Sequence, residues 1–546
     1  MYIITNPDEQ ERYSHLYTPV RYCDVDMRVR LAKPGSTAGT YVWDSEHLDC
    51  RDIVGNNFSY EASATPNNTF GLGAANIDTI TADILYSSPR AAILDDIDVE
   101  SGENGDCGNA EIYIEIGYGA QSPYNLDGTF THTTAKVPLG TFVLQDKTCK
   151  VGENKYTLKL QSLMTKFDKD LPAGFSPTNN SVMSGILEDR QIAKADCLAL
   201  LQLCCSYCKR IGYWDSLGAW HSAEYMQLSS KMDISTAAGR AYVASIPNLT
   251  GVYFDIPTDA GYLTFRDIIK DVATICGCFA TMDPVGGLLL VPFAPMEQMC
   301  LRLNDGTTNT ETPAPEYDIC TKYQENLGIF KIREIRCRAE QEDAQTGEMV
   351  EVNYDAPVTS SDYPDFYDIT GTKLLKYFDD KTDIQPAVMQ IYNNLAYQLS
   401  SVPNYQPVPF DIETAAADFR LQLGDWVCAR SNFKDRLGNN FFCIAQIMRV
   451  SFKLAGKARY QSFTLPTDND RNASKRQSGA EGDFPTDEGG EAPPPPEPPV
   501  IIFDNYGQWL FGDEDAIREE YEAVGEPGKT YHVSIYGQWS FGSSNL

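Results

Sequence analysis

Short runs in which apolar and polar residues alternate or cluster dominate the first 170 positions of the chain. Val, Ile, Thr and aromatic residues gather in these runs, and Gly, Asn, Asp and Pro separate them. This pattern, with no helical stretch between the runs, predicts a many-stranded sandwich or barrel rather than a doubly wound α/β fold. The expected strands are 80–85, 110–116, 140–145 and 156–160.

The apolar spacing changes to three and four residues in the middle of the chain. It does so over 194–210 and again over 265–276, which predicts two amphipathic helices. The second helix has Thr264 as its expected N-cap and Asp267 three residues later, the arrangement of a capping box.

Strand patterning returns between residues 313 and 463. Two runs, 329–338 and 349–352, have the spacing of hairpin arms, and a predicted helix at 386–399 interrupts the strands that follow. The last expected strands are 407–412, 426–429, 441–452 and 459–464.

The end of the chain has a different character. Residues 466–500 are polar, rich in Gly, Asp and Glu, and finish in a Pro-rich stretch, which predicts a mobile tether that stiffens into polyproline II. After it a Tyr-Gly-Gln-Trp motif occurs twice, within 506–512 and 536–542.

These patterns predict an α+β fold that is mainly β, with two sandwich- or barrel-like domains and a helix-bearing region between them. The expected segments are an N-terminal β domain (1–170), a helix-bearing region (171–300), a second β domain (301–465), a flexible linker (466–500) and a repeat module (501–546).

The net charge of the chain argues against some classes of function. The 546 residues include 44 Lys and Arg against 76 Asp and Glu, a formal net charge of −32. That balance argues against a nucleic-acid binder and against docking on anionic lipid. The excess acid is either ordinary solvated surface or the wall of a channel through which DNA slides without sticking.

No targeting or spanning segment is expected. No apolar run reaches the roughly 18 residues of a membrane span, and the first 13 residues lack the pattern of a signal peptide. We therefore expect no membrane insertion and assembly in a cytosol. The 15 cysteines, scattered and odd in number, are expected to be reduced and mostly buried thiols.

The sequence offers no catalytic constellation. Its five histidines lie more than four residues apart, and it lacks the zinc-protease, nucleophile-elbow and Walker motifs. Gly71-x-Gly73 lacks the third Gly of a dinucleotide loop. We therefore expect no catalytic residues, no metal, no cofactor and no enzymatic activity.

Four thiols leave one alternative open. Cys205-x-x-Cys208 and Cys276-x-Cys278 could together hold zinc, which accepts four thiolates. Cys205 and Cys208 lie one helical turn apart, however, where free Cys behaves as a small hydrophobic residue, and this spacing favours core packing.

The aromatic repeat supplies the candidate binding residues. Its side chains can dock a partner protein, form a small local core, or stack on sugar rings while amides bind hydroxyls. The candidate partner- or glycan-binding residues are Tyr506, Gln508, Trp509, Phe511, Tyr536, Gln538, Trp539 and Phe541.

Several stretches, taken in order, resemble the baseplate hub family of tailed phages, which includes tail-associated tail-tip proteins. The best match begins at Thr264-Phe265-Arg266-Asp267 and runs through Phe279 to a strand ending near Val291. The resemblance spans roughly residues 50–465. The other stretches are 52–60, 70–83, 139–144, 156–171, 423–427 and 444–452.

The resemblance implies a structural virion protein at the tail tip or baseplate. Such hubs are homotrimeric rings with two β-domains per subunit, which together mimic a six-fold ring. They join the tail tube to the distal spike or fibres, with the tape measure protein as a further neighbour, and their lumen belongs to the path of DNA ejection. DNA would pass an acidic lumen without specific binding.

Two other functions stay open at this point. The first is a carbohydrate-binding adhesin or receptor-binding tail protein that holds a host surface glycan on its aromatic repeat. The second is a cell-wall hydrolase using carboxylates that the sequence does not single out.

Overall fold

The computed structural model forms two compact units, Met1–Gln477 and Ser478–Leu546. It describes residues 22–31, 42–49, 51–64, 73–95, 110–119, 135–149, 152–210, 212–214, 220–222, 225–292, 316–317, 320–325, 332–343, 346, 348–357, 365–369, 371–380, 383–400, 408–414, 422–434, 440–453, 458–465, 500–503 and 530–533.

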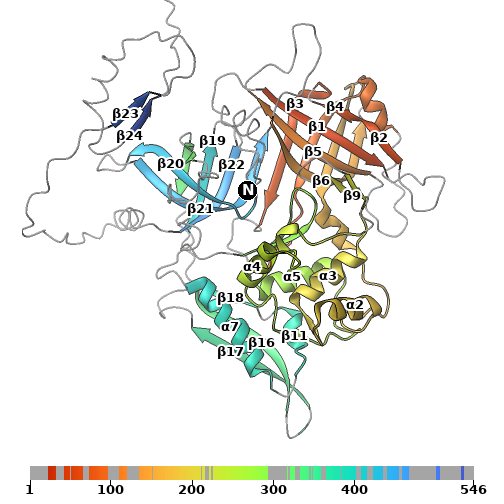
Figure 1. The fold of residues 1–546 in the computed structure, drawn as a ribbon, viewed down its shortest axis with the longest axis vertical. Coiled ribbons are helices and arrows are strands. Elements are labelled where there is room, and N and C mark those ends of the chain that lie inside the picture. Colours follow the sequence, from red (N-terminus) through yellow and green to blue (C-terminus); the bar gives the residue numbers. More distant parts are fainter. Residues whose placement is uncertain are drawn as a thin grey trace, which may run out of the picture. The chain divides into compact units, whose positions relative to one another are not determined.

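The N-terminal region is a run of antiparallel strands in the order β3-β4-β7-β6-β5-β1-β2. All four strands expected before residue 170 are present (Figure 1). The strands are β1 (Tyr22–Leu31), β2 (Val42–Leu48), β3 (Ile53–Ser63), β4 (Thr79–Leu85), β5 (Ala110–Gly119), β6 (Ala135–Cys149) and β7 (Lys155–Ser162).

The alternation of apolar residues explains this register. Ile80 lies opposite Leu160 and Ala82 opposite Leu158, so the buried side chains of β4 and β7 share one face. A slip of one residue in either strand would turn its buried side chains toward the opposite face.

The C-terminal strands belong to the same sheet. Strand β21 pairs with β22 and β20 and also with β3, and β19 and β15 continue beyond β22. The expected strands after residue 400 are all found. The strands are β14 (Glu316–Tyr317), β15 (Cys320–Glu325), β19 (Val408–Thr414), β20 (Trp426–Lys434), β21 (Asn440–Lys453) and β22 (Ala458–Leu465).

The expectation of a mainly β, α+β fold is thus confirmed at the level of class. Instead of two separate sheets, the described strands of both β regions form one 13-stranded sheet, whose main path ends at β15 and β2. The connection through β3 and β21 produces this difference.

Helices lie between the two β regions in the chain. The predicted helices at 194–210 and 265–276 are α3 (Cys197–Tyr207) and α5 (Phe265–Ile275), and Thr264 and Asp267 form the expected capping box. Helices α3 and α5 pack together, with the rings of Tyr207 and Phe265 stacked 5.5 Å apart.

Two further helices were not predicted. They are α2 (Ser181–Arg190), which begins at the cap Asn180, and α4 (Ala237–Ser245), which begins at the cap Thr236. Each buries only one or two residues, so neither leaves a clear apolar period in the sequence.

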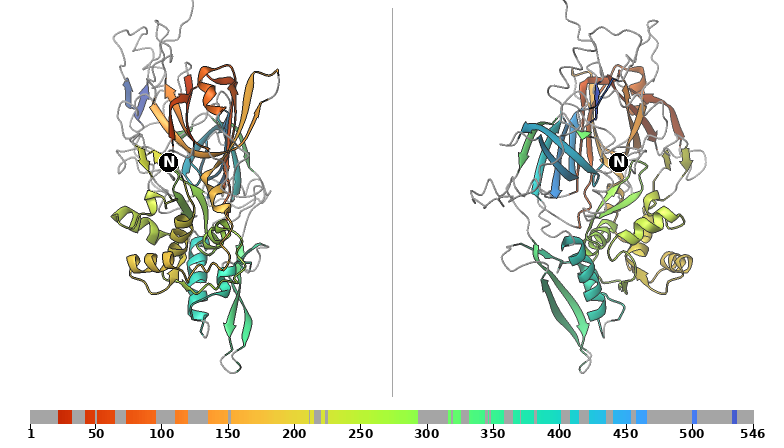
Figure 2. Two further views of the ribbon diagram at one scale, coloured as in Figure 1. Left: turned by 90° about the vertical axis from the view of Figure 1, so that its right-hand side faces the viewer. Right: turned by 60° about the vertical axis from the view of Figure 1, so that its left-hand side comes forward.

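A small layer follows the helical region. Strands β16 (Ile332–Glu342) and β17 (Met349–Pro357) form the expected antiparallel hairpin, and β18 (Asp365–Asp368) pairs with β16. The predicted helix at 386–399 is α7 (Gln385–Ser400), which lies beside this layer in Figures 1 and 2.

Short elements complete the described part. No helix in the described part of the chain is long and apolar enough to cross a membrane. The short elements are η3 (Pro89–Leu94), η4 (Leu163–Asp168), β8 (Ala195–Asp196), β9 (Gly212–Trp214), β10 (Trp220–Ser222), η5 (Ser230–Met232), β11 (Tyr253–Phe254), β12 (Cys278–Met282), β13 (Leu288–Pro292), η6 (Lys373–Lys376), β23 (Val500–Phe503) and β24 (Thr530–Val533).

Candidate functional site: the junction of the two β regions

The two β regions meet where β3 pairs with β21. Tyr60 lies opposite Phe452 in this register, with ring centroids 5.2 Å apart, and Phe142 of β6 contacts Tyr60 edge-on at 6.3 Å. The Ala64 N–H donates to the Met448 carbonyl at 2.7 Å. Backbone pairing and aromatic packing therefore join parts of the chain that lie far apart in sequence.

The hairpin β12–β13 contacts the N-terminal side of this junction. The Gly73 N–H donates to the Cys278 carbonyl at 2.8 Å, and the Ala280 N–H donates to the Ala74 carbonyl at 2.7 Å. A Cβ on Gly73, whose φ is +84°, would lie 1.9 Å from Thr274 Oγ1. Both φ and close packing thus require Gly here, so this residue belongs to a tight backbone contact with α5.

The same hairpin contacts the C-terminal side. A Cβ on Gly424, at φ +83°, would lie 2.3 Å from Val291 Cγ1 and 3.2 Å from Phe279 Cζ. The Gly424 N–H donates to the Ile447 carbonyl of β21 at 2.7 Å. Gly424 therefore lets the chain pass directly between the hairpin and β21.

Three of the stretches behind the family resemblance come together at this hairpin. They are 70–83, the segment from Thr264 to Val291, and 423–427, and their contacts are those of Gly73, Ala280 and Gly424. Their residues are packing and turn residues, so the arrangement positions backbone rather than reactive groups.

Asp78, at the start of β4, is a buried carboxyl beside this junction. Its N–H donates to Ser162 Oγ at 3.1 Å, and its carbonyl accepts from the Ser162 N–H at 2.8 Å. Burial raises the pKa of Asp78 to about 7. Burial, and then the nearby Asp78 charge, raises the pKa of Tyr60 well above its usual range. Asp78 had no signal in the sequence, because nothing in the local pattern marks it as buried.

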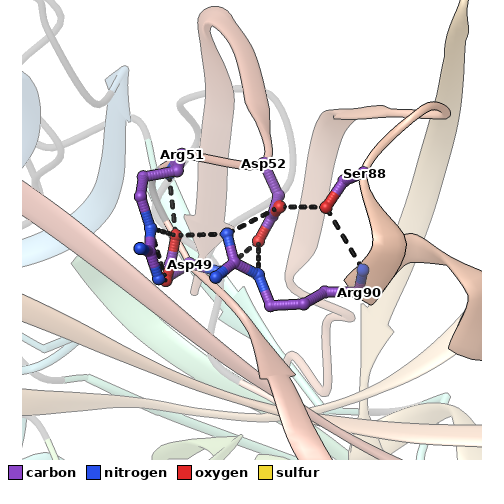
Figure 3. Close-up of polar contacts among 5 residues, drawn as sticks. All are labelled: Asp49, Arg51, Asp52, Ser88 and Arg90. Carbon is purple, nitrogen blue, oxygen red and sulfur yellow. Dashed lines mark hydrogen bonds and ion pairs between the residues drawn. The ribbon is translucent and has the colours of Figure 1, made fainter. Parts of the chain in front are cut away.

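A second group of buried carboxyls is fully compensated. Asp49 and Asp52, each 1% exposed, flank the turn into β3, and the guanidinium of Arg90 lies between them (Figure 3). Arg90 Nε donates to Asp52 Oδ2 at 2.9 Å, and Arg51 Nε donates to Asp49 Oδ1 at 2.9 Å. Burial acts to raise the pKa of Asp49, but the hydrogen bonds from Arg51 and the charge of Arg90 outweigh it and lower that pKa.

Two carboxylates and two guanidiniums balance in this cluster, which closes the corner formed by β2, β3 and η3. Ser88 adds a hydroxyl that donates to Asp52 Oδ1. These charge-assisted hydrogen bonds fix the corner of the sheet.

The cysteines behave as packing residues. Cys197, Cys204, Cys205, Cys208, Cys276 and Cys278 are all buried. Burial raises the pKa values of the thiols of Cys204, Cys205 and Cys278. Among the described residues no three His, Cys, Asp or Glu side chains gather as a metal site would require.

The binding residues predicted from the sequence lie outside the described residues. Of the repeat module, only β23 and β24 are described, as a parallel pair on the approaches to the two motifs. The binding role of the repeat module therefore stays a prediction. The candidate residues are Tyr506, Gln508, Trp509, Phe511, Tyr536, Gln538, Trp539 and Phe541.

Comparison with known proteins gave structures only: no family model matches the chain, and no curated protein matches it. A tail protein from Neisseria meningitidis MC58 is 10% identical over 81% of this chain and 96% of its own, with a TM-score of 0.35. Prophage tail protein gp18 from Listeria monocytogenes EGD-e is 9% identical over 83% and 98%, with a TM-score of 0.37.

A 43 kDa tail protein of prophage MuSo2 from Shewanella oneidensis gives similar values. It is 9% identical over 82% of this chain and 99% of its own, with a TM-score of 0.36. Two structures of the phage P2 baseplate in its activated conformation also match. These five solved structures are tail proteins and baseplate assemblies.

Proposed function

We propose that this chain is the subunit of a homotrimeric hub at the tip or baseplate of a phage tail. The observation that carries the proposal is the single sheet formed by the two β regions through β3 and β21. A subunit with two β regions fixed to each other presents two comparable blocks to a ring. Three such subunits supply six blocks, which suits a junction between a six-fold tube and a three-fold tip.

The junction gives this subunit a rigid centre. The hairpin β12–β13 is hydrogen-bonded to the segment before β4, and Gly424 packs against it from the segment before β20. A hub transmits force between the tail tube above and the spike or fibres below. Close-packed contacts without room for a Cβ suit that task.

The charge of the chain supports a role along the DNA path. At −32 per subunit, the ring would carry a strongly negative field. An acidic lumen repels the phosphates of the passing genome and keeps DNA from binding the wall. The proposed neighbours are the tail tube, other distal tail proteins and the tape measure protein.

The proposal includes a separate role for the C-terminal repeat. On its Pro-rich tether, this module would dock a neighbouring tail component or touch a glycan on the host surface. The proposed location of the whole chain is the tail tip of the virion, after assembly in the host cytoplasm, and the proposed role is structural rather than enzymatic.

Negative-stain imaging of the purified full-length chain tests the proposal. We expect class averages with three-fold symmetry and an open centre. Compact particles without a central opening, at concentrations where the chain is fully folded by circular dichroism, would contradict the hub.

A further inference from the structure

Helix α7 buries one of its faces. Ile384, just before the helix, and Val388, Ile391 and Leu395 within it are at most 1% exposed. Their spacing of three and four positions places them on one face. This inner face belongs to the same core as β16 and η6, so the orientation of α7 is fixed by burial.

A buried asparagine strengthens this attachment. Asn248 Nδ2 donates to the carbonyls of Ile275 and Ile391 at 2.9 and 3.2 Å, and Asn394 Nδ2 donates to Asn248 Oδ1 at 2.8 Å. These bonds connect the end of α5 to the middle of α7. The opposite face of α7 is therefore held in a defined direction.

That outer face is exposed and carries no charge. Gln385, Met389 and Asn393 are exposed and follow one another at intervals of four, which forms a continuous stripe. Met389 is 39% exposed. The sequence has no Asp, Glu, Lys or Arg between Asp383 and Asp411, although 22% of the whole chain is charged.

The other surface helices do not share this feature. Glu188 and Asp189 are exposed on α2, and Arg240 is exposed on α4. Helix α5 carries Arg266 and Lys270 on its partly buried side. An exposed helical surface without charge thus stands out among the described helices, and depletion of charge with a central Met is typical of the core of a protein interface.

The charge of the chain indicates which partner fits. A basic partner would bind best where acidic side chains face it. The chain has 76 acidic residues, but none of them lies in the stripe, so the stripe does not suit a basic partner. Two copies of a chain with net charge −32 repel each other wherever acidic surfaces meet. An uncharged stripe avoids that repulsion and avoids desolvating unpaired charges.

We propose that the Gln385–Met389–Asn393 stripe of α7 is the surface through which copies of this chain contact one another. The inference rests on the proposed trimeric function and names the surface that holds the trimer together. In it, the stripe of each subunit packs against the adjacent subunit around the open centre, with Met389 in the middle of the contact and the amides of Gln385 and Asn393 supplying hydrogen bonds at its rim.

Added charge on the stripe is the direct test. In the full-length chain, Met389→Glu with Asn393→Glu places two carboxylates on the outer face and leaves the inner face untouched. The control, Ala237→Glu with Ala241→Glu, adds the same charge at the same spacing to exposed positions of α4. Mass is measured by light scattering, and folding by circular dichroism and thermal unfolding.

We expect the stripe variant to fall from about three times 60.7 kDa to about 60.7 kDa with an unchanged thermal midpoint, while the control keeps the wild-type mass. If the stripe variant keeps the wild-type mass, the stripe is not the contact surface, but the trimeric hub stands. If the wild type itself is a monomer, both the inference and the trimeric hub fail.

A photocrosslinking residue in place of Met389 identifies the occupant without disturbing charge. Irradiation of the assembled protein, which is otherwise wild type, should yield a crosslink between two copies of this chain. The crosslink is recognised by peptide mass. A crosslink only to a different tail protein, or only within one chain, would overturn the proposal.

Discussion

Helices α3 and α7 are both free of charged residues, but for different reasons. Eight of the eleven residues of α3 are buried inside the chain, including Leu198, Leu201 and Cys205. Helix α7 buries one face and exposes Met389 and its neighbours on the other. Absence of charge in α3 is explained by the fold of one chain, whereas burial within one chain does not explain it on the exposed face of α7, where we propose that copies meet.

The difference shows how an acidic protein distributes its charge. Inside the described core, charged side chains occur chiefly where a partner compensates them, as Arg190 does for Asp196 at the start of α3. On the exposed face of α7, charge is absent where we propose that copies of the chain meet. Charge placed on each helix should therefore have separate consequences, for folding in α3 and for assembly in α7.

The largest effect is expected inside α3. Leu201 is fully buried, so Leu201→Glu buries an unpaired carboxylate and removes apolar packing. We expect a loss of about 5 kcal/mol or more in the free energy of unfolding. Leu201→Met, which keeps volume and polarity, should cost less than about 1.5 kcal/mol. Circular dichroism melts measure both, and equal melts would show that α3 is not the interior helix described.

The next largest effect on stability is expected from Asp78, a carboxyl that is buried inside the fold. Because burial raises the pKa of Asp78 from its ordinary value of 3.8 to about 7, the folded state holds a proton that the unfolded state releases. Stability from this group is therefore complete below about pH 4 and is lost as pH rises through about 7. The full difference is on the order of 4 kcal/mol at most.

Asp78→Asn removes this ionisation. We expect the variant to gain stability relative to wild type between pH 5 and pH 8, measured from thermal midpoints at both values. Asp83→Asn is the matched control: burial acts to raise the pKa of Asp83, but bonds from Lys155, Thr157 and Asn57 outweigh it and lower that pKa. At pH 8 the Asp83→Asn variant should be less stable than wild type, because it loses an ionised carboxylate that is stabilised by these bonds. A constant offset between Asp78→Asn and wild type would refute the buried-carboxyl account.

The attachment of α7 to the fold predicts a smaller change. Asn248 has φ +58° and three hydrogen bonds, so Asn248→Ala loses the bonds and adds backbone strain. We expect a cost of about 3 kcal/mol, and about 1 kcal/mol less for Asn248→Gly, which relieves the strain. Denaturant titration distinguishes the two, and indistinguishable variants would show that the left-handed conformation carries no cost.

The smallest effect is expected from the C-terminal segment. Removal of residues 466–546 takes away the linker and repeat module but neither α3, α7 nor the β3–β21 junction. In light scattering the truncated chain should still give three times its own, smaller subunit mass. Loss of assembly would place the contact between copies in the C-terminal segment instead of in α7.

Local patterns predicted much of the fold. The capping box at Thr264, the apolar spacing of α3 and the turn-bounded strands all follow from neighbouring residues. Helices α2 and α4 were missed because their apolar faces are short, although the caps Asn180 and Thr236 were visible as residue types.

The site was less accessible to prediction because its contacts are non-local. Glu61 and Arg449 form an ion pair across 388 positions, and alternation reveals which face of a strand is buried but not which strand is its neighbour. The closeness of Gly73 to Thr274 and of Gly424 to Val291 likewise has no local sign. The resemblance named three of the segments that meet at the hairpin β12–β13, but not the contacts between them.

The most direct test of the hub is the mass of the wild-type chain in solution. Light scattering after size exclusion, repeated from low to high protein concentration, should give about three times the subunit mass of 60.7 kDa. A mass of about 60.7 kDa at every concentration would contradict the trimeric hub and, with it, the role assigned to α7.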